Sequence, residues 1–523
     1  MASSSIGDLA KIQAEPREIA RWQKAQQHLL AGRHAPALQS YRELANRFPG
    51  VAQLWLELAM SAMGDIEFPL AHEALQRCLE LAATDAPMLV LAGEQYQRLQ
   101  RFDDARKAFE LAVAADPNFT HAQLTLAAHL ERMRRVDDAW GCVEEALKRA
   151  PNAAAAIYFR AFLLHRRGQN VEAETALREL IKSAPQDLGV KSSSRHLLGV
   201  VLDELGKPAE AMHWLGEAKA LVRHTANAVA LQKIYDQTDR RRRVLMAELN
   251  RATIDRWRQD GRADTHPYRL AFLGGHPRSG TTLVEQILGA HPAIMAFDEP
   301  EAFMREVVTA LTPSDSARGL TLDGLNALSA AQRQNLRHRY WKSLLRDGNA
   351  TPDAQVVVDK NPSPTSSLPV WLRMFPDVKV IIPLRDPRDV VLSCYFQNLT
   401  LTAGNVNFLS LQGAAQHFAD LMDVWLRMKA IGGFDWIETR YESVVENLEA
   451  EGRRVTEFTG LPWHAQQAKF YESAKTKFVF APTYHDVTKP AHKRAIGRWE
   501  KYAEQLAPVM EKLRPYCEAL GYS

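Results

Sequence analysis

The sequence predicts an α-helical solenoid followed by an α/β domain with a parallel sheet. Three observations lead to this prediction: a 34-residue repeat in the first half, short apolar runs separated by helical patterns in the second half, and a glycine-bearing turn after the first of those runs. At 523 residues the chain is too long for one ordinary core. We expect an N-terminal segment at 1–23, a solenoid at 24–220, a helical linker at 221–264 and an α/β domain at 265–523.

The composition excludes several classes of protein. The 65 basic and 62 acidic residues leave a net charge of only +3, so we expect no nucleic-acid partner. The four cysteines, at positions 78, 142, 394 and 517, are far apart and form no zinc or disulfide pattern, which suits a reducing compartment. No window approaches the roughly 18 apolar residues of a membrane span. We therefore expect a cytoplasmic protein.

The first half repeats itself at a constant period. Each unit has an alanine, then a bulky apolar residue four positions later, then a small or apolar residue three positions further on. The alanines are Ala37, Ala71, Ala105, Ala139 and Ala173; the bulky residues are Tyr41, Leu75, Phe109, Val143 and Leu177. A sixth unit follows with a four-residue slip, at Gly206, Ala211, Leu215 and Ala218.

This pattern resembles the tetratricopeptide repeat, in which each unit is a pair of antiparallel helices. The resemblance implies a superhelix that binds a protein or peptide partner on its concave face. The alternative is a scaffold that only solubilises or dimerises the other half. The sequence leaves the oligomeric state open.

The second half begins with a strand, a turn and a helix. Leu270–Leu273 is an apolar run, and helical spacing resumes at Leu283. Between them lies Gly274–Thr282, whose spacing from Gly275 matches a P-loop, G-x-x-x-x-G. The usual lysine is replaced by Thr281, and the cation lies inside the loop as Arg278. This P-loop-like turn predicts a phosphate-bearing donor, and we expect no metal.

Three later apolar runs end in basic residues. Val356–Val358 leads to Lys360, Val378–Leu384 leads to Arg385, and Trp436–Thr439 leads to Arg440. The carboxyl ends of parallel strands lie at one edge of a sheet, where ligands bind. Cations gathered there suit a ligand with several phosphate-like groups.

Two motifs make a family resemblance specific. P-R-S-G-T-T-L, at 277–283, and R-D-P-R-D-x-x-x-S, at 385–393, resemble the donor-binding motifs of sulfotransferases, which use 3′-phosphoadenosine-5′-phosphosulfate. The resemblance covers roughly 268–523. Ala290-His291-Pro292, the D-K-N-P turn at 359–362 and the K-P…G-R-W pattern of 489–490 and 497–499 are most similar to the tyrosylprotein sulfotransferase branch.

The resemblance implies which residues bind the donor. The loop would hold the 5′-phosphosulfate, Arg385 and Ser393 the 3′-phosphate, and Tyr441 would flank the adenine. Arg498 takes the place of a donor-binding lysine. The implied donor-binding set is Arg278, Ser279, Gly280, Thr281, Thr282, Arg385, Ser393, Tyr441 and Arg498.

The resemblance also implies the catalytic residues. Lys360 would stabilise charge on the bridging oxygen of the leaving nucleotide, with Arg278 nearby, and Glu299 would be the base for the acceptor hydroxyl. Asp298 competes for the role of base.

The sequence therefore predicts a sulfotransferase that acts on protein tyrosine, with the repeats recruiting the substrate or a partner. One alternative keeps the reaction and changes the acceptor to a carbohydrate, lipid or small-molecule hydroxyl. Another is a repeat-based binding adaptor with a degenerate transferase half.

Overall fold

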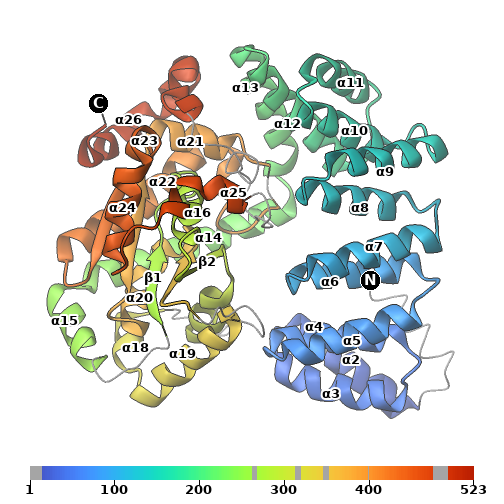
Figure 1. Cartoon of the computed structure of the whole chain (residues 1–523), viewed down its shortest axis with the longest axis horizontal. Coiled ribbons are helices and arrows are strands. Elements are labelled where there is room, and N and C mark those ends of the chain that lie inside the picture. The colour runs from blue at the N-terminus through green and yellow to red at the C-terminus, as the bar shows by residue number, and fades with distance from the viewer. Residues whose placement is uncertain are drawn as a thin grey trace. The chain divides into compact units, whose positions relative to one another are not determined.

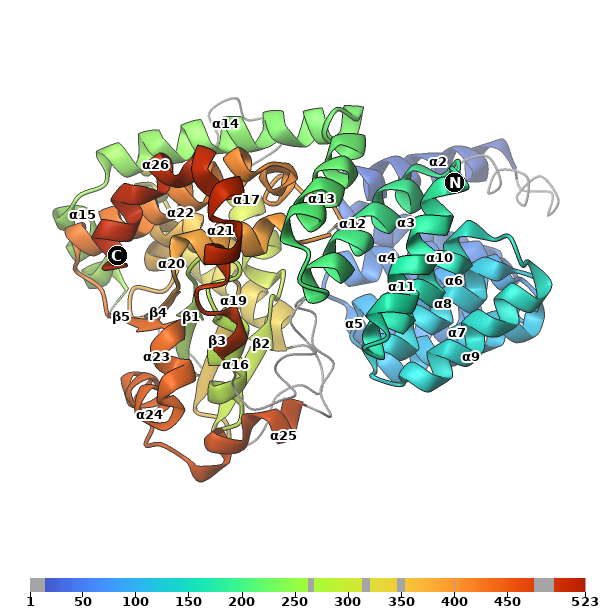
Figure 2. The ribbon, with the colours of Figure 1, turned by 90° about the horizontal axis from the view of Figure 1, so that it is seen from above.

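The computed structural model describes residues 15–261, 268–312, 320–345, 353–398, 400–474 and 493–522. Of these residues, those up to Ala176 form one compact unit and those from Leu177 onward form a second (Figures 1 and 2). Positions 1–14 of the predicted N-terminal segment and the Lys489-Pro490 motif lie outside the described residues. The domain boundaries at 24, 221 and 265 stay predictions.

The first unit is built from consecutive helices joined by short turns. They are α2 (Pro16–Leu30), α3 (His34–Arg47), α4 (Ala52–Gly64), α5 (Phe68–Leu81), α6 (Ala86–Arg98), α7 (Phe102–Ala115), α8 (Thr120–Arg132), α9 (Val136–Arg149), α10 (Ala154–Arg166) and α11 (Asn170–Lys182), the last of which continues into the second unit.

The repeat pattern marks the packed positions of these helices. All five alanines of the pattern, and all five bulky residues four positions later, are 0% exposed. The turn inside each pair also repeats, because φ is positive at Gly32, Ile66, Gln100, Arg134 and Gly168, each one repeat period after the last. A left-handed residue reverses the chain at the same point in every unit. The predicted solenoid is therefore confirmed.

The second unit begins with a helical hairpin, α12 (Leu188–Glu204) and α13 (Pro208–Arg223), which is the predicted sixth repeat. Leu215 of this hairpin belongs to the same apolar cluster as the core of the α/β domain. Two helices follow, α14 (Ala226–Glu248) and α15 (Arg251–Asp260). α14 is tied to the α/β domain because Tyr235 and Arg243 both donate hydrogen bonds to Asp420, at 2.6 and 2.7 Å.

The centre of the second unit is a five-stranded sheet in which every pair of neighbouring strands is parallel. Its strands are β1 (Arg269–Leu273), β2 (Ile294–Asp298), β3 (Val356–Lys360), β4 (Lys379–Leu384) and β5 (Trp436–Arg440), in the order β2-β3-β1-β4-β5. The predicted parallel α/β sheet is confirmed. β2 was not among the predicted strands, and it lies at the edge next to β3.

Helices cover both faces of the sheet. Side chains alternate along each strand, and the apolar residues on either face pack against a different set of helices. On β1, Ala271 and Leu273 pack with α16 (Thr281–Gly289) and α24 (Leu448–Phe458). Leu270 and Phe272 face a larger cluster on the other side. That cluster includes residues of α19 (Ala330–Leu345), α20 (Leu368–Met374), α21 (Pro387–Tyr395), α22 (Leu411–Ile431) and α26 (Ala503–Leu520).

Short helices complete the domain. They are η1 (Met304–Val308, a π-helix), α17 (Thr309–Leu311), α18 (Leu322–Asn326), η2 (Ser363–Ser367), η3 (Val406–Leu409), α23 (Tyr441–Glu446), η4 (Ala465–Lys469), α25 (Phe470–Ala474), η6 (Lys493–Ala495) and η7 (Arg498–Tyr502). Within the described ranges, every helix is too short or too polar to cross a membrane.

Candidate active site

The loop between β1 and α16 is shaped by two glycines with positive φ. A Cβ at Gly275, where φ is 93°, would lie 2.8 Å from the carbonyl oxygen of Pro383 on β4. A Cβ at Gly280, where φ is 91°, would lie 2.6 Å from the ring of Tyr441. Only glycine fits both positions. The loop is therefore pressed against β4 and against the residue that follows β5.

The start of α16 presents open backbone donors. Ser279 uses its backbone N–H and its hydroxyl within the loop, since both donate to the carbonyl of His276, at 3.1 and 2.7 Å. None of the described residues accepts a hydrogen bond from the backbone N–H groups of Gly280, Thr281 and Thr282. These N–H groups and the helix dipole favour an anion at this end of α16.

Arg385, directly after β4, lies beside this loop and is only 7% exposed. One terminal nitrogen donates to the carbonyl of Arg278 at 3.2 Å, and the other donates to the carbonyl of Ala495. Its guanidinium lies 5.0 Å from the ring centre of Tyr441. The buried Nε has no hydrogen-bond partner among the described residues. A buried guanidinium N–H without an acceptor fits an anionic ligand that would supply one.

Arg278 and Ser393 meet although they are 115 residues apart in the chain. The Nε of Arg278 donates to the hydroxyl of Ser393 on α21 at 3.0 Å. Arg278 adopts a left-handed backbone, with φ of 75°. The structure therefore brings together, in one set of contacts, five predicted donor-binding residues: Arg278, Gly280, Arg385, Ser393 and Tyr441.

Arg498 does not join these contacts. Its guanidinium donates to Asp203 of α12 at 2.6 Å and lies 4.2 Å from the ring centre of Phe396. The residues on either side of it, Gly497 and Trp499, donate their backbone N–H groups to Asp389, at 2.9 and 2.8 Å. The segment thus borders the donor-binding residues, while the Arg498 side chain is engaged elsewhere.

A second cluster lies where β2 and β3 end. The two strands are paired in register, so Asp298 lies opposite Lys360. Lys360 is 0% exposed; it forms an ion pair with Asp298 and donates to the Glu299 carboxylate at 3.1 Å. Burial lowers the pKa of Lys360, but the carboxylates of Asp298, Glu299 and Glu285 outweigh it and hold that pKa above its ordinary value. Lys360 therefore carries its charge at neutral pH.

Glu299 is held by its backbone and open at its side chain. Its N–H donates to the carbonyl of Lys360 at 2.7 Å, and its φ of 50° is left-handed. The side chain is 43% exposed. A carboxylate that is fixed at its base and accessible to solvent can reach an acceptor hydroxyl.

Two buried carboxylates were missing from the predicted site. Asp389 stands behind Arg385, with Oδ2 3.7 Å from the guanidinium. The i, i+4 spacing within R-D-P-R-D could have revealed that pair. Asp359 accepts a hydrogen bond from Tyr340 at 3.0 Å. Burial raises the pKa of Asp359 to about 7, although the Tyr340 hydrogen bond and the Lys360 charge oppose the shift.

The described residues contain no group of three or more histidine, cysteine or acidic side chains that could hold a metal ion. The cations and open N–H groups around the loop can bind an anion with more than one phosphate-like group. Lys360 is paired in register with Leu273, the last residue of β1, so the Lys360–Glu299 pair lies at the same edge of the sheet as the loop.

Comparisons with known proteins are consistent with this arrangement. Residues 271–465 match a family model described as the sulfotransferase family, and residues 86–119 match the tetratricopeptide repeat. An uncharacterized protein of Aquifex aeolicus is 26% identical over 345 residues, which are 65% of this chain and 43% of that protein. Protein-tyrosine sulfotransferase A of Caenorhabditis elegans is 24% identical over 269 residues, which are 50% of this chain and 69% of that protein.

Among solved structures, PilF of Pseudomonas aeruginosa aligns with 40% of this chain and 93% of its own, at 18% identity and a TM-score of 0.31. This chain spans less than half the length of the Aquifex relative.

Proposed function

We propose that this chain, which joins tetratricopeptide repeats to a domain of the sulfotransferase family, transfers a sulfuryl group from 3′-phosphoadenosine-5′-phosphosulfate to the hydroxyl of a protein tyrosine. One observation carries the proposal: residues from the loop, from α21 and from the ends of β4 and β5 contact one another around a buried Arg385 Nε that has no acceptor among the described residues. We assign donor binding to these residues and to the open N–H groups at the start of α16.

The donor, when bound, supplies a sulfuryl group attached to a good leaving group. The sulfuryl group carries less charge than a phosphoryl group, so cationic side chains could stabilise its transfer. In our proposal Arg385 and Ser393 bind the 3′-phosphate, and the loop from Arg278 to Thr282 binds the other end. Tyr441 packs against Arg385 and Gly280 and would flank the adenine.

We assign the role of base to Glu299, which would take the proton of the acceptor hydroxyl while the acceptor oxygen bonds to sulfur. In the same step the bond between sulfur and the bridging oxygen of the donor breaks, and adenosine 3′,5′-bisphosphate leaves. Lys360 donates to that same carboxylate at 3.1 Å. As Glu299 gains the proton it loses its charge, and the hydrogen that Lys360 donated to Glu299 can turn to the leaving oxygen while the ammonium keeps its ion pair with Asp298. Asp298 is the less suitable base because its carboxylate is 11% exposed, against 43% for Glu299.

Donor binding is tested by calorimetry with adenosine 3′,5′-bisphosphate in the presence of a chelator. We expect binding to the wild-type chain and its loss in Arg385→Met. The matched control is Arg269→Met, because Arg269 lies at the opposite end of a neighbouring strand and donates to Gly460. Strict dependence on a divalent metal, or unchanged binding in Arg385→Met, would contradict the proposal.

The role of Glu299 is tested by the Glu299→Gln variant in a transfer assay with labelled donor and tyrosine peptides. We expect transfer to fall at least about 100-fold, the order of a lost general base, while the affinity for adenosine 3′,5′-bisphosphate stays within about twofold. Glu301→Gln, two residues on and also exposed, is the control. A parallel assay with a sugar alcohol and a small phenol distinguishes protein tyrosine from the alternative acceptors.

We further propose that the repeats recruit the acceptor protein in the cytoplasm. Mass spectrometry of host proteins sulfated by the full chain identifies that acceptor. Hydrogen exchange with and without it should then show protection in α2–α11. Protection confined to residues after Leu177 would leave the repeats as a scaffold.

A further inference from the structure

The hairpin α12–α13 contacts two segments that border the proposed donor site. One is the end of α21, the helix that carries Ser393. The other is residues 495–502, which pass beside Arg385. Both sets of contacts lie within the second compact unit. A repeat-like hairpin that precedes the α/β domain in sequence therefore reaches the donor-binding residues through defined hydrogen bonds.

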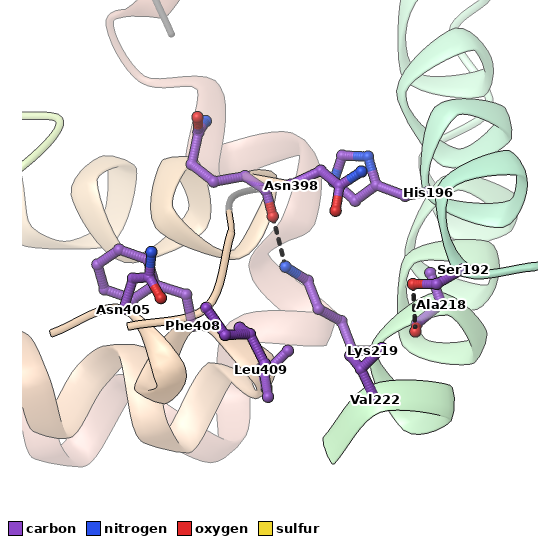
Figure 3. Close-up of a pocket in the computed structure, with 11 residues that line it drawn as sticks. Ser192, His196, Ala218, Lys219, Val222, Asn398, Asn405, Phe408 and Leu409 are labelled. Atoms are coloured by element: carbon purple, nitrogen blue, oxygen red, sulfur yellow. Dashed lines mark hydrogen bonds between the residues drawn. The ribbon is translucent and has the colours of Figure 1, made fainter. Parts of the chain in front are cut away.

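The first set of contacts caps the end of α21. His196 Nε2 lies 3.1 Å from the carbonyl of Phe396, and Lys219 donates to the carbonyl of Gln397 at 2.6 Å. Figure 3 shows Lys219 reaching from α13 across a small pocket toward this segment. Helix ends leave carbonyl groups without partners, and donors placed there stabilise the last turn. The hairpin thus fixes the end of the helix on which Ser393 lies.

The second set centres on Asp203. Its carboxylate accepts hydrogen bonds from Arg498, at 2.6 Å, and from Tyr502. The Arg498 guanidinium also stacks on Phe396, 4.2 Å from the ring centre, so it joins the two segments. Asp203 is 17% exposed and Arg498 is 25% exposed. A partly buried, charge-assisted pair of this kind positions a segment more firmly than an exposed pair does.

From Arg498 the contacts continue to Arg385. The backbone N–H groups of Gly497 and Trp499 donate to the two oxygens of Asp389. Asp389 Oδ2 lies 3.7 Å from the Arg385 guanidinium, and the carbonyl of Ala495 accepts from Arg385 directly. Two acceptors orient Arg385, and both depend on the segment that Asp203 holds. The Ala495 carbonyl is part of that segment, and the Asp389 carboxylate is hydrogen-bonded to it.

We propose that Asp203 is a positioning residue for donor binding. By pairing with Arg498 and Tyr502 it holds segment 495–502, so that Ala495 and Asp389 orient the guanidinium of Arg385 with its Nε free for a phosphate oxygen. This inference deepens the proposed function and rests on it. The competing assignment, in which Arg498 itself binds the donor, predicts the opposite result, because removing Asp203 would release Arg498 for that role.

The experiment is calorimetry of adenosine 3′,5′-bisphosphate with the full chain. Asp203→Asn should weaken binding about tenfold, which corresponds to about 1.4 kcal/mol. Arg498→Met should weaken it to a similar extent, and the double variant should be no weaker than either alone, since both changes break one path. Glu217→Gln, an exposed acid on the same hairpin, is the matched control and should bind like the wild type.

Transfer kinetics separate positioning from general damage. Asp203→Asn should raise the donor KM about tenfold and leave kcat and the acceptor KM unchanged. Asp203→Glu, which keeps the carboxylate, should recover part of the affinity. If Asp203→Asn lowers the unfolding temperature below the assay temperature, Arg498→Lys serves instead, with a smaller loss expected in the same direction.

Unchanged or tighter binding in folded Asp203→Asn overturns the inference, and so does an additive double variant. Failure of the proposed function looks different: the wild-type chain would not bind the bisphosphate, or Arg385→Met would bind it as the wild type does.

Discussion

The two halves of this chain place their important residues in different ways. In the repeats, the residues that pack are a few positions apart within a unit and recur in the next unit, as Ala105 and Phe109 do. In the candidate site, Arg278 contacts Ser393, 115 residues away, and Arg385 contacts Ala495, 110 residues away. Changes in the repeats should therefore act locally on stability, whereas changes in the site should disturb several segments together.

The largest expected effect tests the site. Lys360→Met should lower the transfer rate about 100- to 1,000-fold, as the loss of one charge-stabilising donor does. It should also destabilise the domain, since Asp298 would lose its buried partner. Initial rates at saturating donor measure the first effect. The control is Lys379→Met, at the start of β4, where Lys379 pairs with Asp435 at 2.8 Å. A transfer rate of Lys360→Met within tenfold of the wild type would show that Lys360 does not stabilise the transition state.

The next effect concerns Asp359, whose pKa burial raises to about 7 from an ordinary 3.8. The folded chain holds this proton more tightly than the unfolded chain, so stability should fall as pH rises from about 4 to about 7 and be constant above. Asp359→Asn removes this loss while its side-chain carbonyl can still accept from Tyr340. The difference in free energy of unfolding between the variant and the wild type should grow in favour of the variant by about 2 kcal/mol from pH 5.5 to pH 8. The wild type loses about 1.36 kcal/mol for each of the 1.5 pH units between 5.5 and 7, and the variant does not.

Urea unfolding at the two pH values measures this gain. Asp435→Asn is the control, because the Lys379 hydrogen bond lowers the pKa of Asp435 below its ordinary 3.8, so this carboxylate is ionised in both the folded and the unfolded chain at the two pH values. The effect of Asp435→Asn on stability should therefore be the same at both, since the stabilisation by Asp435 is lost only as pH falls below about 4. A gain for Asp359→Asn that does not change with pH would show that Asp359 is ionised in the folded chain.

A smaller effect tests whether the repeats behave locally. Gly93 on α6 faces Phe109, and a Cβ there would lie 2.7 Å from a ring carbon of Phe109. The positions one repeat period before and after Gly93 hold alanine, at Ala59 and Ala127, and both are fully buried. At Gly93 the Phe109 ring takes the space of the methyl group, so Gly93→Ala should lower the free energy of unfolding by about 1 to 2 kcal/mol. Overpacking outweighs the better helix propensity of alanine. Adding Phe109→Leu should recover most of the loss.

Thermal unfolding measures both variants, and calorimetry with the bisphosphate provides the comparison with the site. Donor affinity should stay within about twofold of the wild type, as expected for distant, independent positions. Weaker donor binding in Gly93→Ala would contradict the expectation that changes in the repeats act on local stability and leave the candidate site undisturbed.

The smallest effect concerns a repeated turn. Gln100 has φ of 60° at the position that glycine occupies at Gly32 and Gly168. Gln100→Gly should stabilise the repeats by about 0.5 kcal/mol, because relief of the left-handed strain exceeds the added freedom of the unfolded chain. Gly168→Ala should destabilise them by a similar amount. Urea unfolding distinguishes the two signs, and equal signs would contradict the assignment of strain to this turn.

Much of the fold could be predicted because its signals are periodic. The buried alanines, the bulky residues that follow them, the sixth hairpin and the buried strands all lie where the patterns indicate. β2 was missed because its apolar run, Ile294–Phe297, is short and follows closely on a helix that ends at Gly289. That strand matters to the site, because it sets Asp298 opposite Lys360 and Glu299 just beyond it.

The sequence by itself determined the repeat register, the helix-and-sheet layers and the residue types at each strand end, because these depend on spacing along the chain. Only the tertiary structure decided which of those residues meet. It brought Arg278 to Ser393 and Lys360 to Glu299, and it paired Arg498 with Asp203, which is far away in the sequence. The order of the strands and the packing of the hairpin set these contacts, and neither is encoded in a local pattern.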